Sequence, residues 1–193
     1  VKKENHLKNN LKNISNNLKF VENPYITTRL IDSDLIKYIY DIKSRKFDET
    51  IDARFGKGRC SIDFELFDNN NYLIKDLSND LINICQNALN SKIYVYDSFF
   101  NILNTDGGTT PHNHIAEFDI NQGLVNQKYS LVYYISTGDQ SASNPGTLKL
   151  YNPNKEILPK EGMIVIIPAN QNHSAVYNGS KDRIMIGMNF YCL

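Results

Sequence analysis

Three of the four histidines lie in the second half of the 193-residue chain, with a spacing that metal sites use. His112 and His114 are separated by one residue, and His173 follows later in the chain. If residues 111–118 form a strand, as we expect, the imidazoles of the first pair project from the same face and can share one ion. Imidazole binds Fe, Zn, Cu and Ni, so the residue types predict a mononuclear site without selecting its metal. Spacing alone also fits solvated histidines in a polar turn.

A single arginine follows these histidines. The chain has five arginines, and Arg183 is the one that lies beyond residue 59, ten positions after His173. A guanidinium group offers a planar fork of donors that binds a carboxylate through two hydrogen bonds, which lysine cannot do. We therefore interpret Arg183 as an anion clamp beside the metal. Taken alone, Arg183 fits better as a surface ion-pair partner of Asp182 or Glu161.

The turn between these two residues gives a first estimate of their geometry. Asn178-Gly179 is a strong signal for a two-residue β-hairpin turn. In that hairpin Ser174 lies opposite Arg183, which puts Arg183 within one residue of His173 across a strand spacing of about 4.8 Å. The last strand then has two faces. The expected core face carries Ile184, Ile186, Met188 and Phe190, and the mixed face carries Arg183, Met185, Gly187, Asn189 and Tyr191.

The overall composition gives no reason to expect a nucleic-acid-binding, membrane or secreted protein. The formal net charge is zero, so no charge excess predicts a nucleic-acid or membrane-surface partner. No apolar stretch has the length of a transmembrane span, and no N-terminal pattern is typical of a secretion signal. The three cysteines have no disulfide or ligand spacing, which indicates reduced thiols and a cytoplasmic protein. The length predicts one domain over residues 1–193.

The first half of the chain, residues 1–92, has mainly helical periodicity. Apolar residues recur every three or four positions in three segments, each of which predicts a helix with one buried face. Residues 51–70 between them are expected to be irregular or strand-like. The three apolar sets are Leu7, Leu11, Ile14 and Leu18; Ile31, Leu35, Ile39 and Ile42; and Leu73, Leu77, Leu81, Cys85 and Leu89.

From about residue 93 the apolar period changes to two, which is typical of strands. Many short strands separated by Gly, Pro and Asn turns predict a jelly roll. The expected fold is therefore α+β, with a β-jelly-roll core over residues 93–193 that carries the metal site. The helices of the first half would pack on one outer face of this core. Strands are expected at 93–104, 111–118, 129–136, 146–151, 162–168, 173–178 and 183–191.

Several motifs in this half resemble a known family in both content and order. The stretch from about Tyr94 to Tyr191 resembles the 2-oxoglutarate/Fe(II)-dependent oxygenases, specifically their prolyl-hydroxylase-like branch. The resemblance covers about half of the chain. The matching segments are PHNH (111–114), SLVYYI (130–135), PGTLKLY (145–151), LPKEGMIVIIP (158–168), then His173, Arg183 and NFY (189–191).

This resemblance implies a double-stranded β-helix, Fe(II) and 2-oxoglutarate as cofactors, and a role for each matched residue. His112 would be the first iron ligand and His173 the distal one. Arg183 would bind the far carboxylate of 2-oxoglutarate, Tyr134 would hydrogen-bond to the same carboxylate, and Asn189 would line the pocket floor. The implied reaction uses O2, converts 2-oxoglutarate to succinate and carbon dioxide, and hydroxylates a substrate C–H bond.

The chain departs from the family at the carboxylate ligand, because His114 occupies that position. Three interpretations are open. His114 itself binds the metal, with the other two histidines; or Glu117 or Asp119 folds back to supply a carboxylate; or His114 is the first ligand, so that Ala116 takes the acid position and leaves coordination open. We favour the first, which predicts a site of three histidines.

The sequence says least about the substrate. The polar loops 117–128 and 136–145 are expected to shape its entry, or else to be solvated turns without a substrate contact. Their polarity suits a peptide or a polar small molecule, and the resemblance favours peptidyl proline. Two other classes remain: a cupin-like metalloenzyme that acts on a small ligand without 2-oxoglutarate, and a non-catalytic jelly-roll binding protein.

Overall fold

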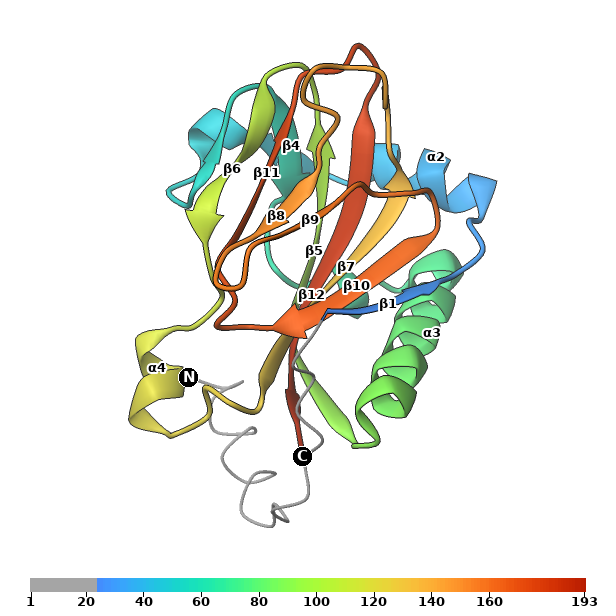
Figure 1. Cartoon of the computed structure of the whole chain (residues 1–193). Helices are drawn as coiled ribbons and strands as arrows, with labels where there is room; N and C mark the ends of the chain where they lie inside the picture. Colours follow the sequence, from blue (N-terminus) through green and yellow to red (C-terminus); the bar gives the residue numbers. More distant parts are fainter. Residues whose placement is uncertain (1–23) are drawn as a thin grey trace.

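Two antiparallel sheets face each other in the computed structural model, which describes residues 24–193 (Figure 1). The helix expected over residues 7–18 lies outside the described residues. The large sheet has the order β1 (Tyr25–Thr28), β10 (Met163–Pro168), β7 (Lys128–Ser136), β12 (Arg183–Cys192), β5 (Ile93–Leu103), β4 (Gly58–Ser61), β2 (Ser44–Lys46). The small sheet has the order β3 (Arg54–Phe55), β6 (Gly107–His112), β11 (His173–Tyr177), β8 (Leu148–Leu150), β9 (Lys155–Ile157).

From β5 onward the chain passes back and forth between the two sheets. β5, β7, β10 and β12 belong to the large sheet, whereas β6, β8, β9 and β11 belong to the small one. This alternation is the winding of a double-stranded β-helix, so the jelly-roll core expected from the sequence is confirmed. Short 3₁₀ helices and three α-helices accompany the sheets within residues 24–193: η2 (Phe47–Glu49), η3 (Leu66–Asp68), α2 (Ser33–Asp41), α3 (Tyr72–Leu89) and α4 (Glu117–Asn121).

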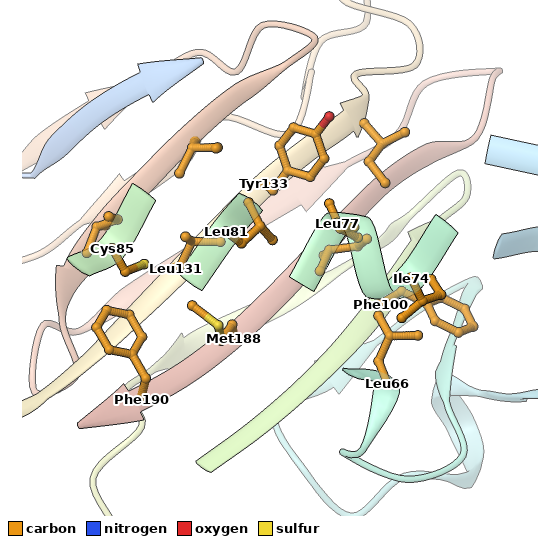
Figure 2. Close-up of a cluster of buried hydrophobic side chains, with 14 of the residues drawn as sticks. Leu66, Ile74, Leu77, Leu81, Cys85, Phe100, Leu131, Tyr133, Met188 and Phe190 are labelled. Atoms are coloured by element: carbon orange, nitrogen blue, oxygen red, sulfur yellow. The ribbon is translucent and has the colours of Figure 1, made fainter. Parts of the chain in front are cut away.

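Helix α3 covers the outer face of the large sheet, as expected (Figure 1). It begins at Asn71, whose side chain accepts a hydrogen bond from the Leu73 N–H at 2.8 Å, and it ends at Asn90 in the left-handed region with φ 49°. Its apolar residues recur every fourth position, so they form one buried stripe. Figure 2 shows Leu77, Leu81 and Cys85 of α3 together with Leu131, Met188 and Phe190 of the sheet.

Strand β12 has the two faces that its alternation predicts. Ile184, Ile186, Met188 and Phe190 belong to the core beneath α3, and each is at most 1% exposed. The other face turns toward the small sheet. It supplies Arg183, Met185 and Asn189 to the cavity between the sheets.

Residues 24–92 hold four short strands besides the expected helices. β1 pairs with β10 at one edge of the large sheet, and β4 pairs with β5 near the other. β3 extends the small sheet beside β6. The sequence placed strand-like residues only at 51–70, because strands of two to four residues are too short to display a period of two. Within residues 24–193 no helix combines the length and apolarity needed to span a membrane.

The predicted hairpin between residues 173–178 and 183–191 is wrong. β11 pairs with β6 and β8 in the small sheet, whereas β12 pairs with β5 and β7 in the large sheet. Asn178 of the expected turn instead contacts the loop before β8, because it accepts a hydrogen bond from the Asn144 N–H at 2.9 Å and donates its own N–H to the Asn144 carbonyl at 3.0 Å. A local turn signal does not report which sheet each strand joins.

The strand expected over residues 111–118 is also wrong beyond His112. Two polar side chains take backbone N–H groups that a strand would need: Asn113 accepts from the Ile115 N–H at 3.1 Å, and Asp119 accepts from the Ala116 N–H at 2.7 Å. The second contact starts α4. His114 therefore lies in a loop rather than on a strand.

We expect the packing of α3 against the large sheet to contribute most of the stability of the fold. Replacing Leu81 of α3, which is fully buried in the core between this helix and the sheet, with alanine should lower the free energy of unfolding by about 2–5 kcal/mol through lost apolar contact and a cavity. Leu30→Ala is the matched control, because Leu30 is 92% exposed, and should change stability by less than about 0.5 kcal/mol. Urea denaturation of both variants measures the difference, and equal losses would contradict this view of the core.

Candidate metal and anion site

The three histidines of the second half converge on one point between the sheets. His112 at the end of β6 and His173 at the start of β11 are directly paired across the small sheet. Their ring centroids are 4.5 Å apart, and the His114 ring lies 5.1 Å from that of His173. One ring nitrogen from each histidine lies within 4.8 Å of the others. The three residues therefore form a group that could hold a single metal ion.

Two of these imidazoles are fixed in the tautomer that a metal needs. His112 Nδ1 lies 2.8 Å from the Thr110 carbonyl oxygen, and His173 Nδ1 lies 2.9 Å from the Gln171 carbonyl oxygen. Because a carbonyl can only accept, each Nδ1 carries the proton and each Nε2 presents its lone pair. The carbonyls therefore orient both rings as metal ligands are usually oriented in proteins.

His114 reaches the same point from the loop after β6. Its backbone N–H donates to the Ala169 carbonyl at 2.9 Å, which ties the loop to the end of β10. Its Nε2 lies 3.3 Å from His173 Nε2, and its Nδ1 lies 3.4 Å from Asn189 Nδ2. The expected convergence is thus reached by a different local structure, a loop held at both ends by polar contacts.

Burial keeps two of these imidazoles, those of His114 and His173, uncharged near neutral pH. Desolvation lowers the pKa of His114 well below its usual value of 6.5, and the neighbouring His173 and His112 lower it further. Desolvation, with a smaller effect from His112, lowers the pKa of His173 to about 4. A neutral imidazole is the form that binds a metal. Both His114 and His173 are therefore in the metal-binding form at pH 7.

All six site residues expected from the sequence line one cavity of about 350 Å³ between the sheets. The small sheet and the loop after it provide the histidines, whereas β7 and β12 provide the other three. Sequence reasoning missed Asp97, Phe99 and Asn101 of β5, although their two-residue spacing could have shown that they share a face. The six expected residues are His112, His114, His173, Tyr134, Arg183 and Asn189.

Arg183 is buried in this cavity without a carboxylate partner among residues 24–193. It is 2% exposed; one terminal nitrogen donates to the Gly146 carbonyl at 3.0 Å, and its Nε–H has no acceptor. The guanidinium carbon lies 5.0 Å from the centroid of the Tyr134 ring. The surface ion pair with Asp182 or Glu161 is not formed. Burying a guanidinium without an anionic partner is unfavourable, so this end of the cavity is suited to bind an anion.

Gly146 makes room for that guanidinium. Its φ of +79° suits glycine, and a Cβ at this position would approach Arg183 Nε to 2.5 Å. The Pro-Gly-Thr motif that carries the family resemblance thus has a structural reason here. It lets the backbone of the loop before β8 pass directly against Arg183.

No protein-family model and no curated protein matches the chain. Solved structures do. A viral collagen prolyl hydroxylase of Paramecium Bursaria Chlorella virus-1, in a 2OG complex, shares 9% identity at a TM-score of 0.62, covering 91% of this chain and 97% of that one. A Trichoplax adhaerens prolyl hydroxylase with a hypoxia inducible factor peptide fragment shares 15% identity at a TM-score of 0.63, and the match covers 99% of this chain and 91% of that one. HygX of Streptomyces hygroscopicus, with nickel, 2-oxoglutarate and hygromycin B, shares 7% identity at a TM-score of 0.66, and the match covers 88% of this chain and 82% of that one.

The chain has the fold of the 2OG-Fe(II) oxygenases. In this oxygenase fold the described cavity lies between the two sheets. Its lining includes Asp52, Ala53, Arg54 and Phe64, of which Asp52 and Phe64 are exposed. The loops 117–128 and 136–145, expected either to shape substrate entry or to be solvated turns, contribute no lining residue to this cavity. Polar groups of both loops are used in local structure, in α4 and in the turn at Asp139.

Neither candidate carboxylate of the loop after His114 reaches the cluster. Asp119 is fully buried, accepts hydrogen bonds from Lys128 Nζ at 2.7 Å and from the Tyr191 hydroxyl, and begins α4. Glu117 is exposed on the first turn of α4. Ala116 only precedes that helix. Within residues 24–193 the ligand cluster around the expected acid position therefore consists of imidazoles alone.

We expect the ion pair of Asp119 with Lys128 to hold the loop that carries His114 in place. Asp119→Ala would leave the buried Lys128 ammonium without its partner and should lower the free energy of unfolding by about 3–5 kcal/mol. Glu117→Ala removes an exposed carboxylate two residues away and should change it by less than about 0.5 kcal/mol. Chemical denaturation of the metal-free variants tests this. Equal, small losses would show that the Asp119–Lys128 pair does not hold the loop.

Proposed function

We propose that this protein is an Fe(II)- and 2-oxoglutarate-dependent dioxygenase that hydroxylates a substrate C–H bond. One observation carries the proposal: the buried guanidinium of Arg183, without a protein carboxylate among the described residues, shares a cavity with three convergent imidazoles. The fold shared with 2OG-Fe(II) oxygenases supports it.

The residues present fit both groups that this activity needs. His112, His114 and His173 would hold Fe(II) through Nε2, since imidazole is a suitable ligand for that ion. The distal carboxylate of 2-oxoglutarate would accept hydrogen bonds from Arg183, including its unused Nε–H, and from the hydroxyl of Tyr134. Bound there, 2-oxoglutarate supplies the two electrons that, with two from the substrate, reduce O2 to give succinate, carbon dioxide and hydroxylated product.

The chain contributes orientation and exclusion of water. The Arg183 fork fixes one end of the dicarboxylate at a set distance from the imidazoles, which is a positional effect on reactivity. Val132, Leu148 and Met185 line the cavity between these two ends and keep it apolar. An apolar wall strengthens each charged contact and limits side reactions with solvent.

For the substrate we propose a peptide or a polar small molecule, with peptidyl proline as the first candidate. Arg54 and Phe64 line the cavity and would offer a cation and an aromatic face to such a molecule. One structure of similar fold holds a peptide fragment, and another holds hygromycin B. We also propose a cytoplasmic location, because all three cysteines are buried thiols without disulfide partners.

The ligand set is tested by metal binding. His114→Ala should weaken anaerobic Fe(II) binding by a factor of about 100 or more, because it removes one of three ligands. Glu117→Ala is the control and should bind as the unchanged protein does, since its carboxylate is exposed on α4. Isothermal titration of the full chain gives both constants. Full affinity in His114→Ala, with loss in the acid variant, would reverse the assignment.

The anion clamp is tested by 2-oxoglutarate binding to the Fe(II)-loaded protein. Arg183→Lys should raise the dissociation constant about tenfold or more, because lysine offers a point charge in place of a fork. Arg29→Lys, whose guanidinium pairs with Asp80 outside the cavity, should leave it unchanged. Anaerobic titration monitored by the visible charge-transfer band measures the constant. Metal binding without any such band in the unchanged protein would instead indicate a cupin-like enzyme that does not use 2-oxoglutarate.

A further inference from the structure

Arg54 brings a second guanidinium to the cavity, and its side chain spans the two sheets. It belongs to β3 at the edge of the small sheet, yet its guanidinium carbon lies 5.3 Å from the centroid of the Phe99 ring on β5 of the large sheet. The same carbon lies 5.4 Å from the Phe64 ring, which packs edge-on against Phe99. The side chain is 8% exposed and lines the cavity. Two aromatic rings therefore hold this cation in place.

One edge of the Arg54 guanidinium is free to bind a ligand. The acceptors that residues 24–193 offer it are Asp52 Oδ2 at 2.8 Å and Cys60 Sγ at 3.4 Å, and both contact Nη1. Within this part of the chain Nε and Nη2 have no acceptor. These two nitrogens form an edge of the fork that binds a carboxylate through two parallel hydrogen bonds. Arg54 therefore keeps the donors that recognise a carboxylate.

A hydrogen-bond acceptor without a partner lies next to Arg54. Asn101 is 4% exposed and lines the same cavity, and its Oδ1 has no donor among the described residues. On β5 it shares a face with Phe99, two residues away, and it stands directly opposite Cys60 of β4. Arg54 contacts both of these neighbours. A ligand that carries an N–H group close to a carboxylate would satisfy both Arg54 and Asn101.

We propose that Arg54 binds a carboxylate of the substrate and Asn101 a nearby N–H group, so that the hydroxylated molecule is an amino acid or a peptide with a free carboxylate. This inference rests on the proposed function and deepens it, because it names the chemical class of the substrate. The carboxylate is either the terminal α-carboxylate or the side chain of an Asp or Glu. Both present the same two oxygens to the fork.

The position of Arg54 suits a substrate that also reaches the histidine cluster. Arg54 pairs with Thr109 of β6, three residues before His112. Three residues of a strand span about 10 Å, which an amino acid or a short peptide can bridge. Arg183 lies on β12, opposite Leu103 of β5. The two guanidinium groups thus belong to different sheets, and each can hold a different acid.

The first test is a selection of ligands by the full chain, loaded with Fe(II) and 2-oxoglutarate under nitrogen. Three pools are offered: free amino acids and random tripeptides with a free terminal carboxylate, made without Asp and Glu; amidated tripeptides that contain Asp or Glu; and amidated tripeptides without either. Mass spectrometry identifies the retained molecules. We expect retention from the first or the second pool, and the pool identifies the source of the carboxylate. Equal retention from the third pool, or none from the first two, overturns the inference.

Titration of a retained molecule into variants of the loaded protein then assigns the contact. Arg54→Gln should weaken its binding about 10- to 100-fold through the loss of charge-assisted hydrogen bonds. Arg54→Lys should weaken it about tenfold, because lysine keeps the charge without the fork. Arg29→Gln is the matched control and should bind within about twofold, since its guanidinium pairs with Asp80 outside this cavity. Unchanged affinity in the Arg54 variants overturns the inference.

Asp52→Asn should give a gain of affinity, which a merely structural role of Arg54 would not produce. Asn keeps an oxygen where Asp52 Oδ1 accepts from the Arg54 N–H and the Thr50 hydroxyl, each at 3.1 Å, so the turn should persist. Without the Asp52 charge, which repels a second carboxylate, the retained molecule should bind about three- to tenfold more tightly. Unchanged or weaker binding overturns the inference, also where Arg54→Gln does not fold.

These outcomes are distinguishable from a failure of the proposed function. If the unchanged protein binds neither Fe(II) nor 2-oxoglutarate, the dioxygenase assignment itself is wrong. If it binds both but selects no carboxylate, only the role of Arg54 is wrong. Arg54→Gln should bind 2-oxoglutarate within about threefold of the unchanged protein, because Arg183 holds that acid. A larger loss would make Arg54 part of the 2-oxoglutarate site and overturn its role toward the substrate.

Discussion

The buried charge of Arg183 is the constraint around which the cavity is organised. A guanidinium at 2% exposure has to be satisfied by neighbouring groups, and those in contact with it are a carbonyl oxygen and an aromatic ring rather than a carboxylate. Such an arrangement leaves part of the hydrogen-bonding capacity for a ligand. Gly146 has no side chain for the same reason, since any Cβ there would displace the guanidinium. The anion site thus depends on the backbone of the loop before β8, at Gly146, as well as on Arg183 of β12.

The two halves of the site come from different sheets, so sheet packing sets their separation. The histidines belong to the small sheet and its connecting loop, whereas Arg183, Tyr134 and Asn189 belong to strands at the centre of the large sheet. α3 packs on the outer face of that centre (Figure 2), and the inner face lines the cavity. We therefore expect substitutions of residues packed between α3 and the sheet to act on the site through the position of β12.

Periodicity predicted the parts of this arrangement that one strand determines. The alternation of β12 separated Ile184 and Ile186 from Arg183 correctly, and α3 was found from its four-residue repeat. Facts that depend on two distant segments were missed. The Asn178-Gly179 turn seemed to join neighbouring strands, but β11 and β12 find their hydrogen-bond partners in different sheets. The loop at His114 was read as a strand because its competing side-chain contacts, from Asn113 and Asp119, are not a matter of hydrophobic pattern. Asp97 was missed because its partner lies on another strand.

His114 stands at the position where the 2-His-1-carboxylate triad of non-haem Fe(II) oxygenases has its acid. The chain does not lack a carboxylate nearby, since Asp119 lies five residues after His114, but that group is committed to Lys128 and to the start of α4. Moving it to a metal would leave a buried ammonium unpaired, which is less favourable than leaving the metal with neutral ligands. In the proposed site of three neutral imidazoles, the ion would keep its full double charge and would attract a dianion more strongly than a site with a carboxylate ligand would.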